Sequence, residues 1–415
     1  MAPQKRVIVI GAGPSGLMAA GQASKAGAET LLLEKMARPA IKFSMTGNSR
    51  GNLTHIGTPS DFIPAFRKNG RFLRQAFSRF FNQELVAFFS EIGVETVVEQ
   101  DGKIYTKSGI AARAAEALMV WARQCGVAIK IAEPAMSLVL EGNAVKGVLL
   151  KDGSCLEADA VAVCTGGATY PGTGSSGDGF VLAESAGHQV TAIRPALVPL
   201  ETIFHAVQGL QGLSLDDVNV RVFASGKLVA EARGDMLFTH YGLSGPAVLS
   251  VSGDVADELL AGHGPVIVSL DLVPDLPEKA VDDDLINRFD THGTMMVRTH
   301  LSDRLPGKLS AAVMDRAEIP LDTHGHQIKK EKRKALVSIL KGWQFEITST
   351  RSMTEAMVTR GGVSLDEVDP RTMESRKVKG LYFAGEVLDL DGDTGGYNLQ
   401  AAFSTGYVAG NAMQG

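Results

Sequence analysis

The pattern of apolar and polar residues at the start of the chain predicts a strand, a tight turn, a helix and a second strand. Residues 6–10 read RVIVI, a short run rich in β-branched side chains, and the sequence GAGPSG follows at once. Small residues fill positions 17–25, as is typical of a helix that packs closely on a sheet. A second apolar run at 29–33 ends on Glu34. This order of elements predicts an α/β fold.

The middle of the chain predicts helices and short strands in turn. Apolar residues at three- and four-residue spacing indicate helices at 73–92 and 108–125, and residues 94–105 between them read as a strand, a turn and a strand. A β-meander inserted into the α/β fold is indicated by three short strands, at 135–140, 144–149 and 154–158. A buried strand at 160–165 leads into glycine-rich loops and a helix at 180–186.

From about residue 194 the pattern changes to short alternating segments, which indicate a separate β-rich domain. Its expected strands are residues 218–223, 227–232, 236–238, 266–270 and 344–348. A helix is expected at 247–255, and the charged stretch 275–318 is expected to be mostly helical. Residues 381–386 form a strand that runs into an acidic turn, and a helix at 399–413 follows a glycine-rich loop. The C-terminal stretch thus repeats the N-terminal order of strand, glycine turn and helix.

The GAGPSG turn has the features of a dinucleotide-binding site. Gly11 permits the tight turn after the strand, Gly13 lets a pyrophosphate approach the backbone, and Gly16 lets the helix pack close to the sheet. The helix N-terminus offers N–H groups and a partial positive charge to the phosphates. Glu34 lies where a carboxylate would accept hydrogen bonds from ribose hydroxyls. The alternative is a glycine-rich turn that binds nothing.

Two further polar stretches bear on this site. Residues 172–177 contain a second GxGxxG pattern, but no strand leads directly into it and residues 188–193 carry no acidic partner. We interpret it as a loop beside the first site. Residues 35–54 contain Lys42 and Arg50 and predict an extended loop that a ligand orders, with a polar surface loop as the alternative.

Composition and charge exclude several other classes of protein. The 415 residues suffice for two or three domains, and the net charge of −5 argues against a nucleic-acid-binding protein. The basic run at 329–334, KKEKRK, is interpreted as a solvated helix face. Three cysteines without a CxxC motif favour a reducing cytoplasm. No apolar run is long enough for a membrane span, and the apolar N-terminus is interpreted as mature fold rather than as a signal peptide.

No metal site is expected from the sequence. His324 and His326 have no third ligand beside them, so a loop histidine pair is the preferred interpretation. The Asp-Gly-Asp sequence at 391–393 lacks the later glutamate of an EF-hand.

Motifs along nearly the whole chain carry a family resemblance: GAGPSG, TGNSRGNLTH, CTGGATYPGTGSSGDG, FTHYGLSGPAVL and MESRKVKGLYFAGEVLDLDGDTGGYNLQAAFSTGYVAG. They resemble the BaiN/YhiN-like family of bacterial NAD(P)/FAD-dependent flavoproteins, which includes bile-acid reductases and an aminoacetone oxidase. The resemblance implies a Rossmann-like FAD-binding domain of the glutathione-reductase type, an inserted β-rich domain and a small helical domain. The implied ranges are 1–193 and 351–415 for the FAD-binding domain, 194–274 and 329–350 for the β-rich domain, and 275–328 for the helical domain.

The resemblance also implies that FAD binds between the two glycine turns near the ends of the chain. The implied contacts are Gly11, Gly13, Pro14, Ser15, Gly16, Glu34, Lys35, Lys42, Arg50, Asn52, Ala135, Met136, Thr165, Gly166, Gly385, Glu386, Asp389, Gly395, Gly396, Asn398 and Leu399. Carboxylates at Glu386 and Asp389 suit the ribitol hydroxyls, and the N-terminus of the last helix can face the flavin pyrimidine ring. The family has Cys where this chain has Gly51, so any thiol function of that loop is lost here.

The expected activity is FAD-dependent oxidoreduction by hydride transfer at flavin N5. The expected substrate is a small enone-like molecule, and NAD(P)H is the co-substrate that the resemblance favours. His240 and Tyr170 are candidate acid–base groups, and Arg50 is a candidate anion anchor. Two alternatives stay open: an amine or hydroxy-compound oxidase that uses oxygen, and a non-catalytic flavoprotein such as a redox sensor or an RNA-modification partner. The expected form is a cytoplasmic monomer or homodimer with no membrane or nucleic-acid partner.

Overall fold

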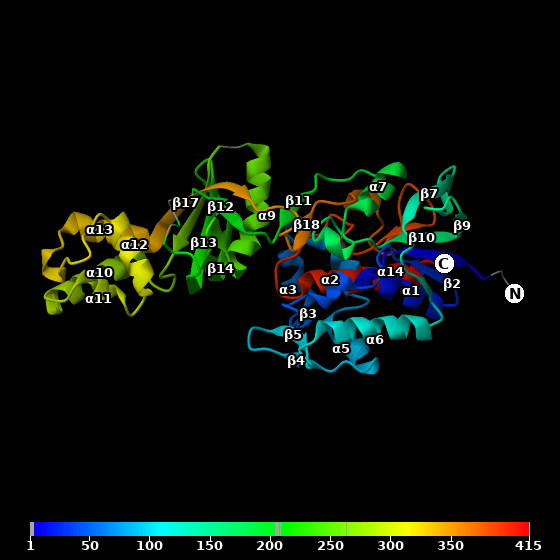
Figure 1. The fold of residues 1–415 in the computed structure, drawn as a ribbon, viewed down its shortest axis with the longest axis horizontal. Helices are drawn as coiled ribbons and strands as arrows, with labels where there is room; N and C mark the ends of the chain where they lie inside the picture. The colour runs from blue at the N-terminus through cyan, green and yellow to red at the C-terminus, as the bar shows by residue number, and fades with distance from the viewer. Residues whose placement is uncertain (1–3, 204–206, 208, 263, 415) are drawn as a thin grey trace. The chain divides into compact units, whose positions relative to one another are not determined.

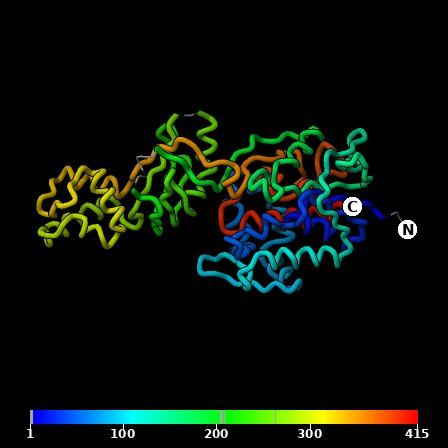
Figure 2. The backbone as a smooth tube through the Cα atoms, in the orientation of Figure 1, coloured from blue at the N-terminus to red at the C-terminus, as the bar shows by residue number. Residues whose placement is uncertain are grey.

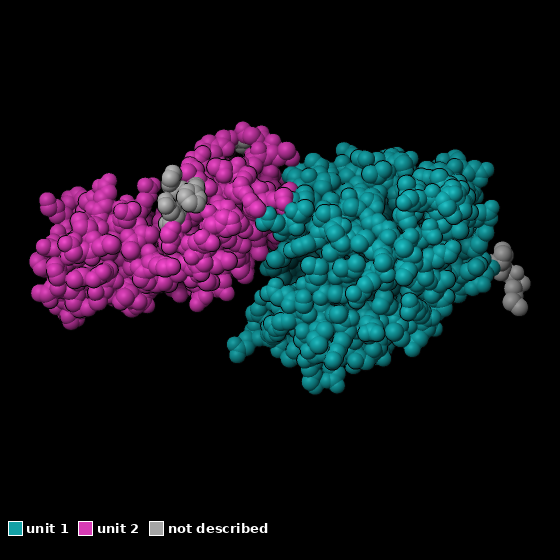
Figure 3. All heavy atoms as spheres, in the orientation of Figure 1, with its two compact units in different colours: residues 1–194, 353–415 teal, residues 195–352 magenta. Residues whose placement is uncertain are grey.

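The chain folds into two compact units, which Figure 3 distinguishes by colour. The computed structural model describes residues 4–203, 207, 209–262 and 264–414. The first unit combines the chain up to residue 194 with the chain from residue 353 onward, and the second unit is 195–352. Figure 2 traces this path: the blue and cyan part of the chain and its orange and red end share one unit.

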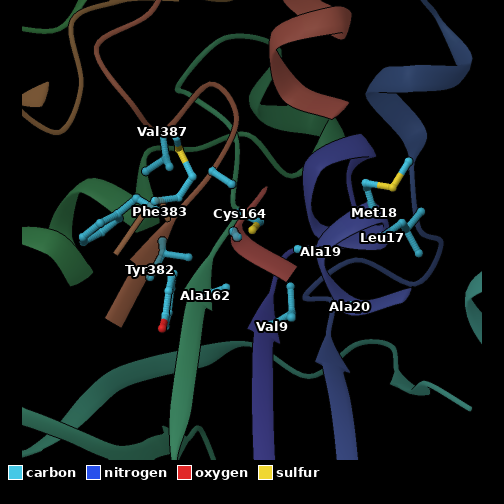
Figure 4. Close-up of a cluster of buried hydrophobic side chains, with 14 of the residues drawn as sticks. Val9, Leu17, Met18, Ala19, Ala20, Ala162, Cys164, Tyr382, Phe383 and Val387 are labelled. Atoms are coloured by element: carbon cyan, nitrogen blue, oxygen red, sulfur yellow. The ribbon is translucent and has the colours of Figure 1, made fainter. Parts of the chain in front are cut away.

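A five-stranded parallel sheet lies at the centre of the first unit (Figure 1). In sheet order its strands are β19 (Leu381–Phe383), β10 (Ala160–Val163), β1 (Arg6–Ile10), β2 (Glu29–Leu33) and β6 (Ala128–Lys130). Val9 pairs with Ala162, and Ala162 pairs with Tyr382 on the other side; Figure 4 shows all three side chains in the core between the layers. The central strands are continuous apolar runs because helices or loops cover both faces of a parallel sheet. The α/β fold predicted from the sequence is confirmed.

Two long helices of this sheet domain come from opposite ends of the sequence. They are α1 (Pro14–Lys25) and α14 (Tyr397–Ala412), and glycines bring their backbones together. A Cβ atom at Gly406 would overlap the carbonyl oxygen of Ser15, and one at Gly410 would overlap that of Ala19. The C-terminal segment therefore supplies both a strand and a covering helix to the N-terminal fold.

Two antiparallel sheets complete the strands around this core. One joins β3 (Asn52–His55), β5 (Lys103–Thr106) and β4 (Thr96–Val98), and the other is the expected meander of β7 (Ala135–Glu141), β8 (Ala144–Leu150) and β9 (Cys155–Glu157). Further elements of this unit include α2 (Ile41–Ser44), α3 (Pro59–Phe62), α6 (Ala111–Gln124), α7 (Asp178–Ser185), β18 (Val358–Arg360) and the 3₁₀ helices η2 (Pro171–Thr173) and η4 (Leu365–Glu367).

The single helix predicted at 73–92 is wrong. A 3₁₀ helix, η1 (Ile63–Leu73), runs into the short α4 (Arg74–Phe77), and α5 (Asn82–Glu91) begins only after a break. At the break Phe81 adopts an extended backbone, and its N–H donates to the Glu84 carboxylate at 3.0 Å. Phe62 packs edge-on against Phe77 and Phe81 at centroid distances of 5.9 and 4.7 Å. Aromatic packing thus overrides the helical periodicity of the segment.

The second unit contains a closed six-stranded barrel. In barrel order its strands are β12 (Leu200–Thr202), β15 (Gly242–Ser244), β14 (Lys227–Phe238), β13 (Ser214–Ala224), β16 (Val266–Asp271) and β17 (Trp343–Thr350). Val218, Val220 and Val222 of β13 alternate with more exposed residues and face the barrel core. The two strands predicted at 227–232 and 236–238 are one continuous strand, β14, which pairs along β13.

Helices make up the rest of this unit, and β11 (Arg194–Ala196) stands at its boundary. They are α9 (Pro246–Ala261), α10 (Glu278–Thr291), α11 (Val297–Leu301), α12 (Gly307–Arg316) and α13 (Lys330–Gly342). The basic run lies at the start of α13, where Lys332 pairs with Glu318 and Arg333 with Asp282, each at 2.7 Å. Within the described ranges, no helix is long and apolar enough to cross a membrane.

Candidate functional site

The loops that follow four strands of the parallel sheet meet at one sheet edge. They begin at Gly11 after β1, Glu34 after β2, Cys164 after β10 and Ala384 after β19. Ligands of open α/β sheets bind outside the carboxyl ends of their strands. A Cβ atom at Gly385 would overlap the Ser15 hydroxyl, so the C-terminal glycine turn lies directly against the N-terminal one.

The N-terminal turn is shaped by its glycines. Gly11 has a φ of +99°, and a Cβ there would lie 2.6 Å from the carbonyl oxygen of Cys164. A Cβ at Gly16 would overlap the carbonyl oxygen of Gly11. A Cβ at Gly13, by contrast, would meet no protein atom within 4 Å. Gly13 therefore opens onto free space at the N-terminus of α1, where backbone N–H groups can bind an anion.

Glu34 is a buried carboxylate with a fixed orientation at the end of β2. Its Oε2 accepts the Ala12 N–H at 2.9 Å, and its Oε1 accepts the Met36 N–H at 2.8 Å. The backbone before β7 lies beside it, because Glu133 N–H donates to the Glu34 carbonyl oxygen at 2.9 Å. Ala135 and Met136, at the start of β7, therefore follow a segment that is bonded to the acidic strand end.

Four segments join in a polar cluster of Lys42, Glu386, Thr169 and Thr359. Lys42 Nζ lies 2.7 Å from Glu386 Oε2 and donates to Thr169 Oγ1 at 2.8 Å. The N–H of Thr359 donates to Glu386 Oε1 at 2.9 Å. The side chains of Lys42 and Glu386 are only 24% and 20% exposed, so solvent screens this ion pair incompletely. The sequence analysis singled out Lys42 and Glu386 but neither threonine: Thr169 lies within the motif CTGGATYPGTGSSGDG, and Thr359 lies outside every quoted motif.

The polar loop after β2 bonds to several other segments of the protein, and its ordering by a ligand stays a prediction. Lys35 pairs with Asp178 at 2.5 Å and also contacts Ser176. Partial burial raises the pKa of Asp178, but the bonds from Lys35 and Ser176 outweigh it and hold that pKa below its usual value. The Asn52 side chain donates to the carbonyl oxygens of Ile104 and Thr54 and accepts the Gly396 N–H at 3.1 Å.

Arg50 and Gly51 turn toward the hairpin of β4 and β5. The Arg50 guanidinium pairs with Glu99 and lies over the Tyr105 ring, 4.3 Å from its centroid. At Gly51, φ is +78°, and a Cβ would lie 2.9 Å from Thr106 Cγ2. This position therefore has no room for the cysteine side chain of the family pattern without local movement.

The loop after β19 is closed by its own side chains. Asn398 Oδ1 accepts the Gly392 N–H at 2.7 Å, and its Nδ2 donates to the Gly392 carbonyl oxygen at 2.7 Å. Asp391 is buried between Arg360, at 3.0 Å, and Arg67, at 3.5 Å. Burial raises the pKa of Asp391, although both arginines act to lower it. Sequence reasoning missed this buried ion cluster, because the three residues lie far apart along the chain.

The remaining predicted positions fall into distinct surroundings. Tyr170 is half-buried in the loop after β10 with a φ of +54°, and the Thr165 hydroxyl lies against Gly179 of α7. Asp389 is half-buried, and its carbonyl oxygen accepts the Asn69 side chain at 2.7 Å. His240 is exposed in the second unit, edge-on to Tyr241. The other predicted contacts, Pro14, Gly166, Gly395 and Leu399, lie within the loops and helix starts already described.

Comparison with known proteins identifies the family. The family model described as "HI0933-like protein Rossmann domain" matches residues 5–412. The chain belongs to the HI0933-like family. The 3-dehydro-bile acid delta(4,6)-reductase of Clostridium scindens is 32% identical over 410 residues, which cover 98% of each chain. The ribosomal RNA dihydrouridine synthase of Escherichia coli K12 is 30% identical over 405 residues, 97% of this chain and 96% of that protein.

Solved structures support the same fold for this HI0933-like protein. A 3-ketosteroid delta1-dehydrogenase from Sterolibacterium denitrificans superposes with a TM-score of 0.53 over 99% of both chains at 13% identity. This likeness shows the fold alone. The family match and the full-length relatives confirm the predicted Rossmann-type FAD-binding domain and FAD-dependent oxidoreductase. The expected BaiN/YhiN-like family is confirmed as well.

The residues at the sheet edge of this HI0933-like protein fit FAD. Gly13 leaves the space that a pyrophosphate needs, Glu34 presents a buried carboxylate for ribose hydroxyls, and Lys42 with Glu386 offers polar groups beyond them. Helices α1 and α14 run in the same direction, because Gly406 packs on Ser15 and Gly410 on Ala19. The N-terminus of α14 therefore lies about two and a half helical turns beyond that of α1, and both offer N–H groups to an extended cofactor. Among the residues that the structure describes, no group of three histidine, cysteine or acidic side chains could hold a metal ion. His324 and His326 each bond a backbone carbonyl oxygen through Nδ1, at 2.6 and 2.7 Å.

Proposed function

We propose that the protein reduces a carbon–carbon double bond conjugated to a carbonyl group and that NAD(P)H re-reduces its flavin. The relationship to the 3-dehydro-bile acid delta(4,6)-reductase, over nearly the full length of both chains, carries this proposal. A double bond at position 4 beside an oxidised position 3 is an enone. Dihydrouridine likewise arises when the uracil double bond beside a carbonyl group is reduced. One chemistry therefore accounts for the activities after which both relatives are named.

The residues at the sheet edge have defined tasks in this proposal. Reduced FAD, when bound, supplies a hydride donor at N5. Gly13, Pro14, Ser15 and Gly16 hold the pyrophosphate at the start of α1, and Glu34 holds the adenosine ribose. Ala135 and Met136 give backbone contacts to the adenine.

Residues from the loops after β2 and β10 and from the C-terminal part of the chain contact the middle and the flavin end of the cofactor. Lys42 and Glu386 orient the ribitol chain, supported by Lys35, Asn52, Thr165, Gly166 and Asp389. Gly395, Gly396, Asn398 and Leu399 present the N-terminus of α14 to the pyrimidine ring. The partial positive charge of that N-terminus would stabilise negative charge there.

A proton must reach the substrate carbon that does not accept hydride. Tyr170 is the proposed donor in the first unit, and Arg50 is the proposed anchor for an anionic substrate group. His240, the other predicted acid–base group, belongs to the second unit, and its assignment stays a prediction. The engagement of Arg50 with Glu99 and Tyr105 means that substrate would have to compete for its guanidinium.

Anaerobic stopped-flow spectroscopy tests the proposal. The FAD-loaded protein is mixed with NADH or NADPH, and flavin bleaching at its visible band is recorded. The reduced protein is then mixed with a cyclic enone such as 2-cyclohexenone or with a 3-oxo-Δ4 steroid. We expect bleaching in the first step and anaerobic re-oxidation in the second.

The alternatives give different results in the same experiment. If an amine or hydroxy compound bleaches the flavin, and only oxygen re-oxidises it quickly, the protein is an oxidase and the proposal is wrong. If neither NADH nor NADPH reduces the flavin, and no enone re-oxidises it after chemical reduction, the result would favour a non-catalytic flavoprotein. A uridine in RNA is the second candidate substrate, because two relatives are ribosomal RNA dihydrouridine synthases.

A further inference from the structure

One surface segment of the first unit has a charge opposite to that of the whole chain. Between Asp61 and Glu84 the sequence has five cationic residues and no carboxylate, although the net charge of the protein is −5. Lys68, Arg71 and Arg74, which we call the basic ridge, are all exposed. The structure gives none of these three side chains an ion pair or a hydrogen bond with any residue in the described ranges.

The helix type places the three cations in one line. Lys68 and Arg71 lie in η1 after the kink at Phe66 and Arg67, and Arg74 begins α4. Side chains three residues apart in a 3₁₀ helix share a face, and each turn rises about 6 Å. That spacing is comparable to the distance between successive phosphates of a single nucleic-acid strand. The basic ridge therefore matches a string of phosphates better than it matches one small anion.

The basic ridge adjoins the C-terminal glycine loop. Asn69, between two of its members, donates to the Asp389 carbonyl oxygen at 2.7 Å, and α4 packs against α14. A Cβ atom at Gly392 would lie 2.7 Å from the Phe66 ring, so the two segments are in direct contact. A polymer held on the basic ridge would pass beside the loop that we assign to the flavin.

Nearby carboxylates do not cancel this positive charge. Asp391 and Asp393 of the loop pair with Arg67, and Asp391 also pairs with Arg360. Glu386 of the same loop pairs with Lys42, and the fourth carboxylate, that of Asp389, is half-buried. A membrane surface suits the segment poorly, because no large apolar side chain is exposed between Ile56 and Val97 in the part of the chain that the structure describes.

We propose that the basic ridge binds the backbone of a single-stranded RNA and delivers an unpaired uridine to the flavin site. The inference rests on the proposed reduction of a conjugated double bond and names RNA as the molecule that contains this bond, in its uridine. An enzyme reaches a base for chemistry only when the base is out of a duplex stack, which favours an unpaired strand. The expectation of no nucleic-acid partner came from the net charge, which averages over the chain and hides a local patch.

The test compares two variants with equal charge loss. Lys68→Gln/Arg71→Gln/Arg74→Gln removes the basic ridge, and Arg113→Gln/Arg123→Gln/Lys130→Gln removes exposed cations elsewhere in the same unit. Binding of a fluorescent oligouridylate to the FAD-loaded protein is followed by anisotropy over a series of salt concentrations. Each lost phosphate contact on a single strand lowers the salt slope by about 0.7, so the ridge variant should lose about 2. The matched variant should keep the slope of the unmodified protein.

Equal slopes for the two variants, or no binding by the unmodified protein, would overturn the proposal. So would ridge-dependent binding to phosphatidylserine vesicles in the absence of RNA binding. Flavin content and thermal melting establish that both variants fold. If the ridge variant does not fold, crosslinking of thiouridine-substituted RNA to the unmodified protein decides. Crosslinks within residues 64–83 support the proposal, and crosslinks confined to other segments contradict it.

These readouts are independent of turnover. Re-oxidation of the reduced flavin by 2-cyclohexenone reports on the proposed chemistry alone. If no enone re-oxidises the reduced flavin, but the salt dependence of RNA binding is weaker in the ridge variant, the proposed reduction is disproved and the RNA-binding surface is supported. If an enone re-oxidises the flavin, but the ridge variant binds RNA with an unchanged salt dependence, the reduction is supported and the RNA-binding surface is disproved.

Discussion

The two glycine turns that meet at the sheet edge are stabilised in different ways. The N-terminal turn is held mainly by nearby parts of the chain: Gly16 permits close contact with Gly11, and the Glu34 carboxylate accepts the Ala12 N–H. A long-range contact joins Gly11 to the carbonyl oxygen of Cys164, and Gly13 stays open. The C-terminal turn is held by side chains from distant segments, chiefly Arg67 and Arg360 through Asp391. A local turn can be exchanged between proteins as a short motif, whereas a turn held at long range depends on the whole domain.

Removal of Asp391 should give the largest effect and act only on the C-terminal turn. Asp391→Ala leaves Arg360 buried without its carboxylate, and breaking a buried pair in this way typically costs about 3–5 kcal/mol. Urea unfolding of the FAD-free protein measures the loss. Asp393→Ala is the matched control, because Asp393 is 37% exposed and should cost less than about 1 kcal/mol. Equal costs for the two variants would contradict long-range stabilisation of this turn.

Two glycines of the N-terminal turn should separate folding from cofactor binding. In Gly16→Ala the new methyl group overlaps the Gly11 carbonyl oxygen, so the free energy of unfolding should fall by about 3 kcal/mol. In Gly13→Ala the methyl group meets no protein atom, so unfolding should change by less than about 0.5 kcal/mol. FAD affinity should nevertheless fall at least about tenfold, or 1.4 kcal/mol, because the methyl group occupies the pyrophosphate path.

Urea unfolding and FAD titration of the same preparations check both values. Gly307→Ala is the control, since a Cβ there also meets no protein atom but lies in the second unit. FAD affinity unchanged in Gly13→Ala would mean that the opening at Gly13 does not hold the pyrophosphate.

The contrast between the turns also explains what the sequence could predict. Gly16 packs on Gly11 and Glu34 bonds Ala12 within about one βαβ unit, so their spacing was sufficient to predict the first turn and the α/β fold. The cluster of Lys42, Glu386, Thr169 and Thr359 depends on four separate segments, and no pattern in one sequence records such a contact. Local periodicity also misled at 73–92, because Phe62 and Phe81 favour a break that only tertiary packing reveals.

The ion pair between the two turns should contribute a smaller, coupled effect. Lys42 comes from the loop of the N-terminal half and Glu386 from the C-terminal turn, 2.7 Å apart and about one-fifth exposed. Lys42→Met and Glu386→Gln should each weaken FAD binding by about 1–2 kcal/mol, with a double-mutant coupling of at least 0.5 kcal/mol. Isothermal titration of the two single variants and the double variant measures the coupling. Strictly additive losses would show that the two side chains act on the cofactor independently.

A buried histidine beside β19, His188, should make the stability of the first unit depend on pH, with a smaller effect than the preceding changes. The His188 ring packs against Phe383 of β19, with Nε2 2.7 Å from Ser375 Oγ and Nδ1 3.1 Å from Glu367 Oε2. Ser375 Oγ already accepts the N–H groups of Lys377 and Val378, so its hydroxyl donates to Nε2, which must be unprotonated.

The sign of the effect follows from the pKa of His188. Burial lowers that pKa, with a further lowering from Lys377, and Glu367 opposes both without reversing the shift. The unfolded chain therefore takes up a proton before the folded protein does, so stability is present above the ordinary histidine pKa and is lost as the pH falls below it. Unfolding free energies measured between about pH 7.5 and pH 5 should decrease toward acid, and His188→Gln should flatten part of that decrease. If the unfolding free energy of His188→Gln falls as steeply toward acid as that of the unmodified protein, groups other than His188 set the acid sensitivity of this unit.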